Sequence, residues 1–153
     1  MGFDRVTHVS QPRDKKLTSL LLFIDFKKAF DTVDSKLLLS KLFDYGFDTG
    51  SLLLIADYFT NRSQKTKMGN SISESKPILL GVPQGSILGP IFFLIFINDL
   101  LFYLSDVSAK LFADDTTLYC CGSELDRLKI KFGKIIDQLL EWCRKNRIDI
   151  NRT

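Results

Sequence analysis

The sequence has 153 residues, of which 45% are hydrophobic and 25% are charged, which excludes a disordered or low-complexity chain and is typical of a globular domain. A chain of this length forms one domain or part of one, and it is long enough to bury a core. Its net charge of +3 permits a nucleic-acid partner without arguing for one. The three cysteines have neither zinc-site nor disulfide-framework spacing, which favours a reducing, intracellular compartment, with nucleus and cytoplasm not distinguished.

The first part of the chain predicts a surface segment, a strand and helices. Residues 1–19 are polar and mixed in charge, without the apolar core of a signal peptide. The apolar run at 20–26 is too short for a helix and is typical of a buried strand. A helix capped by Asp31 or Asp34 then extends to Gly46, and a second helix follows it.

The middle of the chain combines a polar hairpin with a long apolar run. Residues 64–68 and 76–80 predict two short strands, because a Gly-Asn turn signal lies between them. Residues 87–104 are mostly apolar and long enough for a membrane span, but Asn98 and Asp99 interrupt the run. A charge at mid-bilayer costs about 2.5–3.5 kcal/mol. We therefore expect a helix buried in a protein core, and a membrane protein is the least favoured class.

The sequence is organised around residues 111–119, where two β-prone runs flank the adjacent acids Asp114 and Asp115. This pattern predicts a hairpin with both acids at the bend. Neighbouring carboxylates repel each other, and a divalent cation would offset the repulsion, because Mg²⁺ prefers carboxylate oxygens. An ordinary turn is the alternative, since aspartate is a common turn former. If the strand that ends at Asp25 lies beside this hairpin, three carboxylates meet at one sheet edge and form a site for two metal ions.

The last part of the chain completes the expected fold. Residues 123–126 resemble a capping box, an amphipathic helix follows over 125–142, and another strand begins at 148–150. The order strand, helices, hairpin, helix, hairpin, helix predicts an α+β fold in which an antiparallel sheet has helices packed on one face. We expect the three acids on the open face of this sheet.

Four stretches resemble, in order, the motifs of reverse transcriptases (RNA-directed DNA polymerases) of the non-LTR retrotransposon type: FIDFKKAFDTV at 23–33, GVPQGSILGP at 81–90, INDL at 97–100 and FADD at 112–115. The resemblance extends from about residue 20 to residue 151. It implies that 20–153 is a polymerase palm and that 1–19 is a remnant of the region before it. It also implies two Mg²⁺ ions, with Mn²⁺ as a substitute, and an RNA template, a DNA primer and dNTP as partners, with no membrane.

The resemblance assigns roles to individual residues. Asp25, Asp114 and Asp115 match the catalytic metal ligands, and the main-chain carbonyl of Phe26 matches a further ligand. Phe30 matches the bulky residue under the incoming sugar, where a ring would clash with a 2′-hydroxyl and so select deoxynucleotides.

The remaining assigned residues concern the incoming nucleotide. Gln84 matches the glycine-loop residue that contacts this nucleotide, and Gly85 lets the backbone approach it closely. Lys28 matches a position from which a side chain could contact the triphosphate, although an ordinary solvent-exposed lysine is an equally good interpretation of this residue.

Departures from the family pattern define the alternatives. Few residues precede the first motif, and the chain ends just short of the family's lysine-bearing segment, so complete fingers and thumb are lacking. We expect weak or undetectable polymerisation by the isolated chain, and association with the missing parts stays open. A catalytically inactive retroelement remnant, or a nucleic-acid-binding module, is the main alternative. An RNA-dependent RNA polymerase is less favoured, because those enzymes more often have glycine at the position of Ala113 and a polar residue at that of Phe30.

Overall fold

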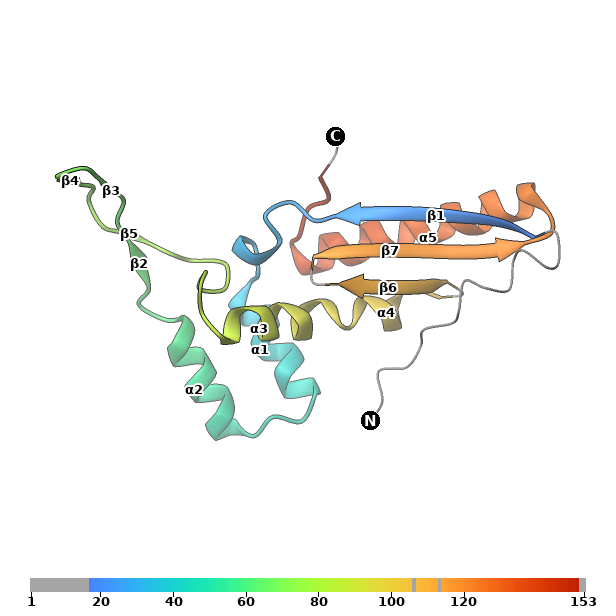
Figure 1. The fold of residues 1–153 in the computed structure, drawn as a ribbon. Coiled ribbons are helices and arrows are strands. Elements are labelled where there is room, and N and C mark those ends of the chain that lie inside the picture. The colour runs from blue at the N-terminus through green and yellow to red at the C-terminus, as the bar shows by residue number, and fades with distance from the viewer. Residues whose placement is uncertain (1–16, 106, 113, 152–153) are drawn as a thin grey trace. The chain divides into compact units, whose positions relative to one another are not determined.

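The computed structural model describes residues 17–105, 107–112 and 114–151, which divide into two compact units (Figure 1). Unit 1 combines the described residues of Met1–Lys27 with those of Ile97–Thr153, and unit 2 is Lys28–Phe96. Most of the N-terminal segment expected over 1–19 lies outside the described residues, and β1 already begins at Thr18.

Unit 1 is built on a three-stranded antiparallel sheet in the order β1-β7-β6. The central strand β7 pairs with β1 along its whole length, so two strands far apart in the sequence lie side by side. Figure 1 shows α5 along one face of this sheet. The elements of unit 1 are β1 (Thr18–Asp25), α4 (Leu100–Tyr103), β6 (Ser108–Phe112), β7 (Asp115–Gly122) and α5 (Leu125–Asn146).

The core of unit 1 follows from the alternation of side chains along its strands. In β7, Thr116, Leu118 and Cys120 are buried, because successive residues of a strand point to opposite faces and these three share the face covered by α5. On the opposite face of β1, Leu21 and Phe23 are exposed by 53% and 76%. The predicted α+β class, with an antiparallel sheet carrying a helix on one face, is therefore confirmed.

The predicted capping box at the start of α5 is wrong. Glu124 occupies the N-cap position without a side-chain hydrogen bond to the helix backbone. Its carboxylate instead pairs with Arg127 Nε at 2.8 Å, one turn along the helix. An ion pair at i,i+3 thus takes the place of the reciprocal cap.

Unit 2 is mainly helical. Asp34 caps α1, as one of the two predicted alternatives, by accepting hydrogen bonds from the amides of Lys36 and Leu37 at 2.9 and 3.3 Å. Asp48 caps α2 in the same way through the Ser51 amide. The elements are η2 (a short 3-10 helix, Ala29–Asp31), α1 (Ser35–Asp44), α2 (Thr49–Phe59), β2 (Ser63–Gln64), β3 (Lys67–Met68), β4 (Ser71–Ile72), β5 (Lys76–Pro77) and α3 (Leu88–Ile97), whose last residue is assigned to unit 1.

The hairpin predicted over 64–68 and 76–80 exists, but its extent was wrong. β2 pairs with β5 and β3 pairs with β4, in two separate ladders of two residues each. Between them, Ser73 N donates to Thr66 O and the Thr66 amide donates to the Ser73 hydroxyl, both at 2.9 Å, so a side-chain oxygen takes the place of one backbone acceptor. Pro77 further limits the β2–β5 ladder, because proline has no amide to donate.

The apolar run at 87–104 forms two helices, where one was predicted. α3 ends at Ile97 and α4 begins at Leu100, so the break falls at the two polar residues Asn98 and Asp99. Within unit 1, the Asp99 carboxylate accepts a hydrogen bond from Trp142 Nε1 at 3.0 Å, so this acid, which precedes α4, has a polar partner on α5. Among the described residues, none of the helices combines the length and apolarity that crossing a membrane requires.

Candidate active site

The acidic strand end, which comprises Asp25, Asp114 and Asp115, lies where β1 and β7 meet. Asp25 and Asp115 are direct cross-strand partners in the β1–β7 register, and both side chains are exposed. Directly opposed residues of an antiparallel pair project to the same face of a sheet. Because Asp25 follows the exposed Phe23 by two positions, both carboxylates belong to the face opposite α5, as expected from the sequence.

Asp114 stands apart from this pair. It is half-buried and lies in the turn before β7. Among the described residues, no three His, Cys, Asp or Glu side chains gather closely enough to hold a metal ion, so the predicted three-carboxylate cluster is not formed. The physical reason is that Asp114 lies in the turn whereas Asp115 already belongs to β7, and that bare carboxylates repel each other. The assignment of all three acids as metal ligands stays a prediction.

Phe26, the other predicted ligand, is 2% exposed and forms a single β-bridge with Ile150. The hydrogen bonds of this bridge run from Lys27 N to Asp149 O and from Asn151 N to Asp25 O, both at 2.8 Å. Main-chain groups of successive strand residues point to alternate sides. The Asp25 carbonyl points toward Asn151, on one edge of β1. The Phe26 carbonyl therefore points to the other edge, where β7 lies.

Asn151 is a polar partner of the acidic strand end that sequence reasoning missed. Its side-chain Nδ2 donates a hydrogen bond to Asp25 Oδ2 at 2.9 Å. The sequence analysis predicted a strand beginning at 148–150 but gave it no partner. A single bridge pairs too few residues to produce an alternating sequence pattern. The only sequence signal for this contact was therefore the predicted start of a strand at 148–150.

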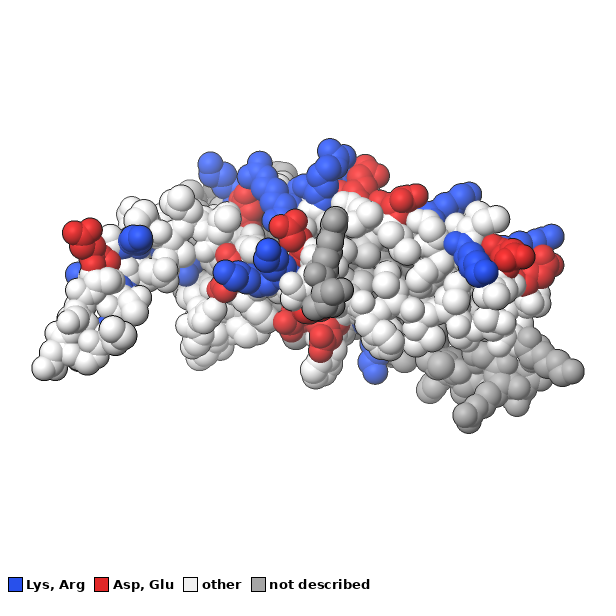
Figure 2. All heavy atoms as spheres, turned by 90° about the horizontal axis from the view of Figure 1, so that it is seen from above, with Lys and Arg blue, Asp and Glu red and all other residues white. Residues whose placement is uncertain are grey.

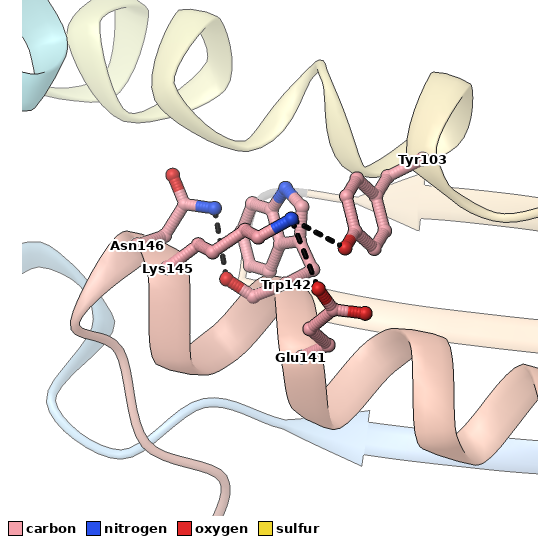
Figure 3. A network of polar contacts seen from close by, with 5 residues as sticks. All are labelled: Tyr103, Glu141, Trp142, Lys145 and Asn146. Carbon is pink, nitrogen blue, oxygen red and sulfur yellow. Dashed lines mark hydrogen bonds and ion pairs between the residues drawn. The ribbon is translucent and has the colours of Figure 1, made fainter.

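A buried aromatic pair lies next to the acidic strand end, and a polar network joins α5 to α4. Trp142, which is 1% exposed, lies on α5 with its ring 6.1 Å from that of Phe26. In Figure 3, Lys145 Nζ donates to Tyr103 Oη at 2.9 Å and pairs with Glu141 at 3.0 Å, while Asn146 donates to the Trp142 carbonyl.

Lys145 and Glu141 each stabilise the charged form of the other. The hydrogen bond to Tyr103 and then that to Glu141 raise the pKa of Lys145, and the hydrogen bond from Lys145 lowers the pKa of Glu141. Lysine and glutamate therefore both stay charged near neutral pH. Through them α4 is joined to α5.

The outer face of α5 carries charges of both signs, paired along the helix at i,i+3 and i,i+4. Figure 2 shows lysine and arginine side chains interspersed with aspartate and glutamate. A surface that binds a phosphate backbone would instead gather one sign of charge. This helix face is therefore a solvated surface.

Unit 2 contains a cavity of about 350 Å³ beside a glycine loop, which we define as Gly81–Ser86. The loop is fixed to the chain around η2 by hydrogen bonds from Gly81 N to Val33 O and from Val82 N to Phe30 O, both at 2.8 Å. Gly81 has a φ of +84°, and a Cβ there would lie 2.8 Å from the Asp31 backbone, so glycine alone fits. The cavity is lined by Phe30, Val82, Pro83, Gln84, Gly85, Ser86, Gly89 and Pro90.

Three of the predicted nucleotide-binding residues line this one cavity. The half-buried ring of Phe30 packs on Phe93 with 4.6 Å between ring centroids, which fixes its orientation. Gln84 is exposed, and its Nε2 donates to Asp31 Oδ1 at 2.7 Å. Gly85 has a φ of +77°, in a region that only glycine enters without strain.

The fourth predicted nucleotide-binding residue, Lys28, is exposed and does not line the cavity. Its backbone is left-handed, with a φ of 48°. Its carbonyl accepts hydrogen bonds from Asp31 N and Thr32 N, which start the 3-10 turn. These contacts give Lys28 a local structural role, and its predicted contact with the triphosphate stays a prediction.

Known proteins resemble this chain over most of its length. The profile of the family "Reverse transcriptase (RNA-dependent DNA polymerase)" matches residues 1–153. Over 155 residues the chain is 29% identical to "Probable RNA-directed DNA polymerase from transposon BS" of Drosophila melanogaster, which covers 94% of this chain and 17% of that protein. It is 27% identical over 136 residues to "RNA-directed DNA polymerase from mobile element jockey" of the same organism, covering 84% of this chain and 15% of the relative.

A third relative, from the same organism, is "Putative 115 kDa protein in type-1 retrotransposable element R1DM". It is 31% identical over 121 residues, covering 78% of this chain and 12% of that protein. The chain thus spans less than a fifth of the length of these relatives, and the predicted resemblance is confirmed at the level of the family. Since the family profile matches the sequence from its first residue to its last, the chain belongs to the reverse transcriptase (RNA-dependent DNA polymerase) family.

Proposed function

We propose that this chain is the palm of an RNA-directed DNA polymerase, which adds dNTP to the 3′-hydroxyl of a DNA primer on an RNA template. The palm comprises 20–153, and the segment 1–19 precedes it. The observation that carries the proposal is the register of β1 and β7, in which Asp25 lies opposite Asp115 on an exposed sheet face. Family membership supports it.

The donors at the acidic strand end suit a hard cation. Carboxylate and carbonyl oxygens are the ligands of Mg²⁺, and Asp25, Asp115 and the carbonyl of Phe26 provide them from two adjacent strands. Asp114 would complete the set by a change in the turn before β7, once a cation offsets its repulsion from Asp115. Two Mg²⁺ ions, or Mn²⁺ in their place, would lower the pKa of the attacking hydroxyl and stabilise the charge on the leaving pyrophosphate.

The glycine-loop cavity would bind the incoming nucleotide. Phe30, held by Phe93, offers a rigid ring as the wall of the cavity, and a 2′-hydroxyl would clash with it. The Gln84 amide, oriented by Asp31, would donate to the nucleotide, while Gly85 leaves room for the backbone to approach. Lys28 would contact the triphosphate. The three free cysteines would stay reduced in the intracellular compartment where we place this reaction.

Incorporation of a single labelled dNTP on a primed RNA template tests the proposal. We expect weak incorporation by the 153-residue chain that requires Mg²⁺ or Mn²⁺ and falls more than a hundredfold in Asp115→Asn. Asp126→Asn is the matched control, because it removes the same charge from an exposed position on α5. If Asp115→Asn, or omission of the divalent cation, leaves incorporation unchanged, the proposal fails and a non-catalytic retroelement remnant takes its place.

Sugar selection is tested by replacing the ring of Phe30. Phe30→Ala should lower the preference for dNTP over NTP at least tenfold, because the wall that meets a 2′-hydroxyl is removed. Phe47→Ala is the control, since this phenylalanine of unit 2 is exposed and does not line the cavity. An unchanged preference in Phe30→Ala would contradict the assigned role, and a wild-type preference for NTP would favour an RNA-dependent RNA polymerase.

A further inference from the structure

Asn151 contacts Asp25 through both its backbone and its side chain. Its amide N donates to the Asp25 carbonyl at 2.8 Å, and its Nδ2 donates to Asp25 Oδ2 at 2.9 Å. Two hydrogen bonds between the same two residues fix the direction of the side chain as well as the position of the backbone. The second bond acts on the carboxylate alone.

The end of α5 delivers Asn151 to this position. Arg147 adopts a left-handed conformation with a φ of 56°, and the Ile148 amide donates back to Cys143 O, which is the pattern of a Schellman motif. The motif reverses the chain, and Ile148 is buried at 3% exposure. The Phe26–Ile150 bridge then aligns the last described residues with the end of β1.

We infer that Asn151 is a positioning residue, whose side-chain amide orients the Asp25 carboxylate for cation binding. The inference rests on the proposed metal-dependent function. Holding Oδ2 leaves Oδ1, which has no hydrogen-bond partner among the described residues, to bind a cation. A carboxamide also suits this task chemically, because it is neutral and orients the carboxylate without cancelling the charge that attracts the metal.

The side-chain bond is not needed to hold the segment in place. The two backbone bonds of the bridge and the burial of Ile148 already fix it to β1. Replacing the side chain should therefore leave the fold intact and change the carboxylate alone. Outer partners of metal ligands act in this way, and their loss typically costs 10- to 100-fold in metal affinity.

The hydrogen bond itself is tested by NMR of the 153-residue chain without metal. The side-chain amide protons of Asn151 should shift clearly when Asp25→Asn removes the charged acceptor. Asp126→Asn is the control, because it removes a carboxylate from an exposed position on α5. Equal responses of the Asn151 resonances to both substitutions would overturn the inference whatever the protein catalyses.

Mn²⁺ binding, followed by electron paramagnetic resonance, tests the consequence. We expect Asn151→Ala to bind Mn²⁺ at least tenfold more weakly than the wild type. Asn70→Ala makes the same change in the exposed turn between β3 and β4 and should bind as the wild type does. Circular dichroism should show equal melting of all three proteins.

The outcomes separate the inference from the function on which it rests. Weaker binding in Asn151→Ala with unchanged melting supports the positioning role. Equal affinities of the wild type and Asn151→Ala overturn this role and leave the proposed function standing. A wild type that binds no Mn²⁺, or binds it equally well as Asp115→Asn, overturns both.

Discussion

Replacing Gly81 by alanine tests how the glycine loop is held beside η2. The φ of +84° costs an L-residue about 1–2 kcal/mol. The new Cβ would also lie 2.8 Å from the Cα and carbonyl oxygen of Asp31, which are backbone atoms that cannot rotate away. Moving them apart costs about 1–3 kcal/mol, as overpacking does elsewhere. We expect Gly81→Ala to lose about 2–5 kcal/mol of unfolding free energy.

Gly46→Ala is the matched control for this prediction. Its φ of +88° is nearly the same, but nothing lies within 4 Å of the new Cβ, so only the conformational cost of about 1–2 kcal/mol applies. Urea unfolding followed by far-ultraviolet circular dichroism measures both variants, because the single tryptophan, Trp142, belongs to unit 1 and does not report on unit 2.

Hydrogen exchange adds a local readout of the same substitution. The amides of Gly81 and Val82 donate to Val33 and Phe30, so Gly81→Ala should speed their exchange, and Gly46→Ala should not. Equal losses of stability in the two variants, with equal exchange, would refute the close approach between the loop and η2.

Three further predictions concern unit 1. Arg147→Gly should raise the melting temperature by about 2–4 °C, since glycine removes about 1 kcal/mol of left-handed strain at the end of α5. Trp142→Phe should lower the unfolding free energy in urea by about 2 kcal/mol, because the carboxylate of Asp99 loses a donor. At pH 8 a thiol reagent should label the exposed Cys121 rapidly, and Cys143 only after unfolding, because burial raises the pKa of Cys143 to about 11 and keeps it a thiol.

Each of these three predictions has a control and a contradicting outcome. Arg144→Gly, inside α5, should lose about 1 kcal/mol, and an equal loss in Arg147→Gly would contradict the strain at the helix end. Asp99→Asn keeps an acceptor for the indole and should lose less unfolding free energy than Trp142→Phe. A larger loss in Asp99→Asn would contradict a stabilising role of this hydrogen bond. Equal labelling rates for all three cysteines in the folded chain would contradict the burial of two of them.

The strands at the centre of unit 1 could be predicted because their signals are local. The apolar run that ends at Asp25 and the β-prone runs around Asp114 and Asp115 each fill a strand, and both carry acids at their ends. The register that places Asp25 opposite Asp115 could not be predicted in the same way. Residues 20–24 are all apolar and Leu21 and Phe23 are exposed, so no alternation along β1 selects one register over another.

Other features could not be predicted, because they depend on single tertiary contacts. The break between α3 and α4 coincides with the hydrogen bond from Trp142 to Asp99, which joins residues far apart in the sequence. The contact of Asn151 with Asp25 needs one bridge and one side-chain bond, and neither leaves a periodic pattern. The absence of a closed cluster of three acids among the described residues likewise depends on the geometry of the turn at Asp114, which the sequence pattern does not define.

The threading of the chain through its two units has a consequence for folding during synthesis. Unit 2 is one continuous stretch, whereas unit 1 needs β1, which precedes unit 2, and β7, which follows it. A ribosome therefore completes unit 2 before it makes β7, so the hydrophobic side chains of β1 stay unpaired until a partner strand far along the sequence is synthesised. Pairing between strands so far apart in the sequence is slow. Until β7 is made, the unpaired edges of β1 are open to aggregation, and we expect a chaperone to bind them.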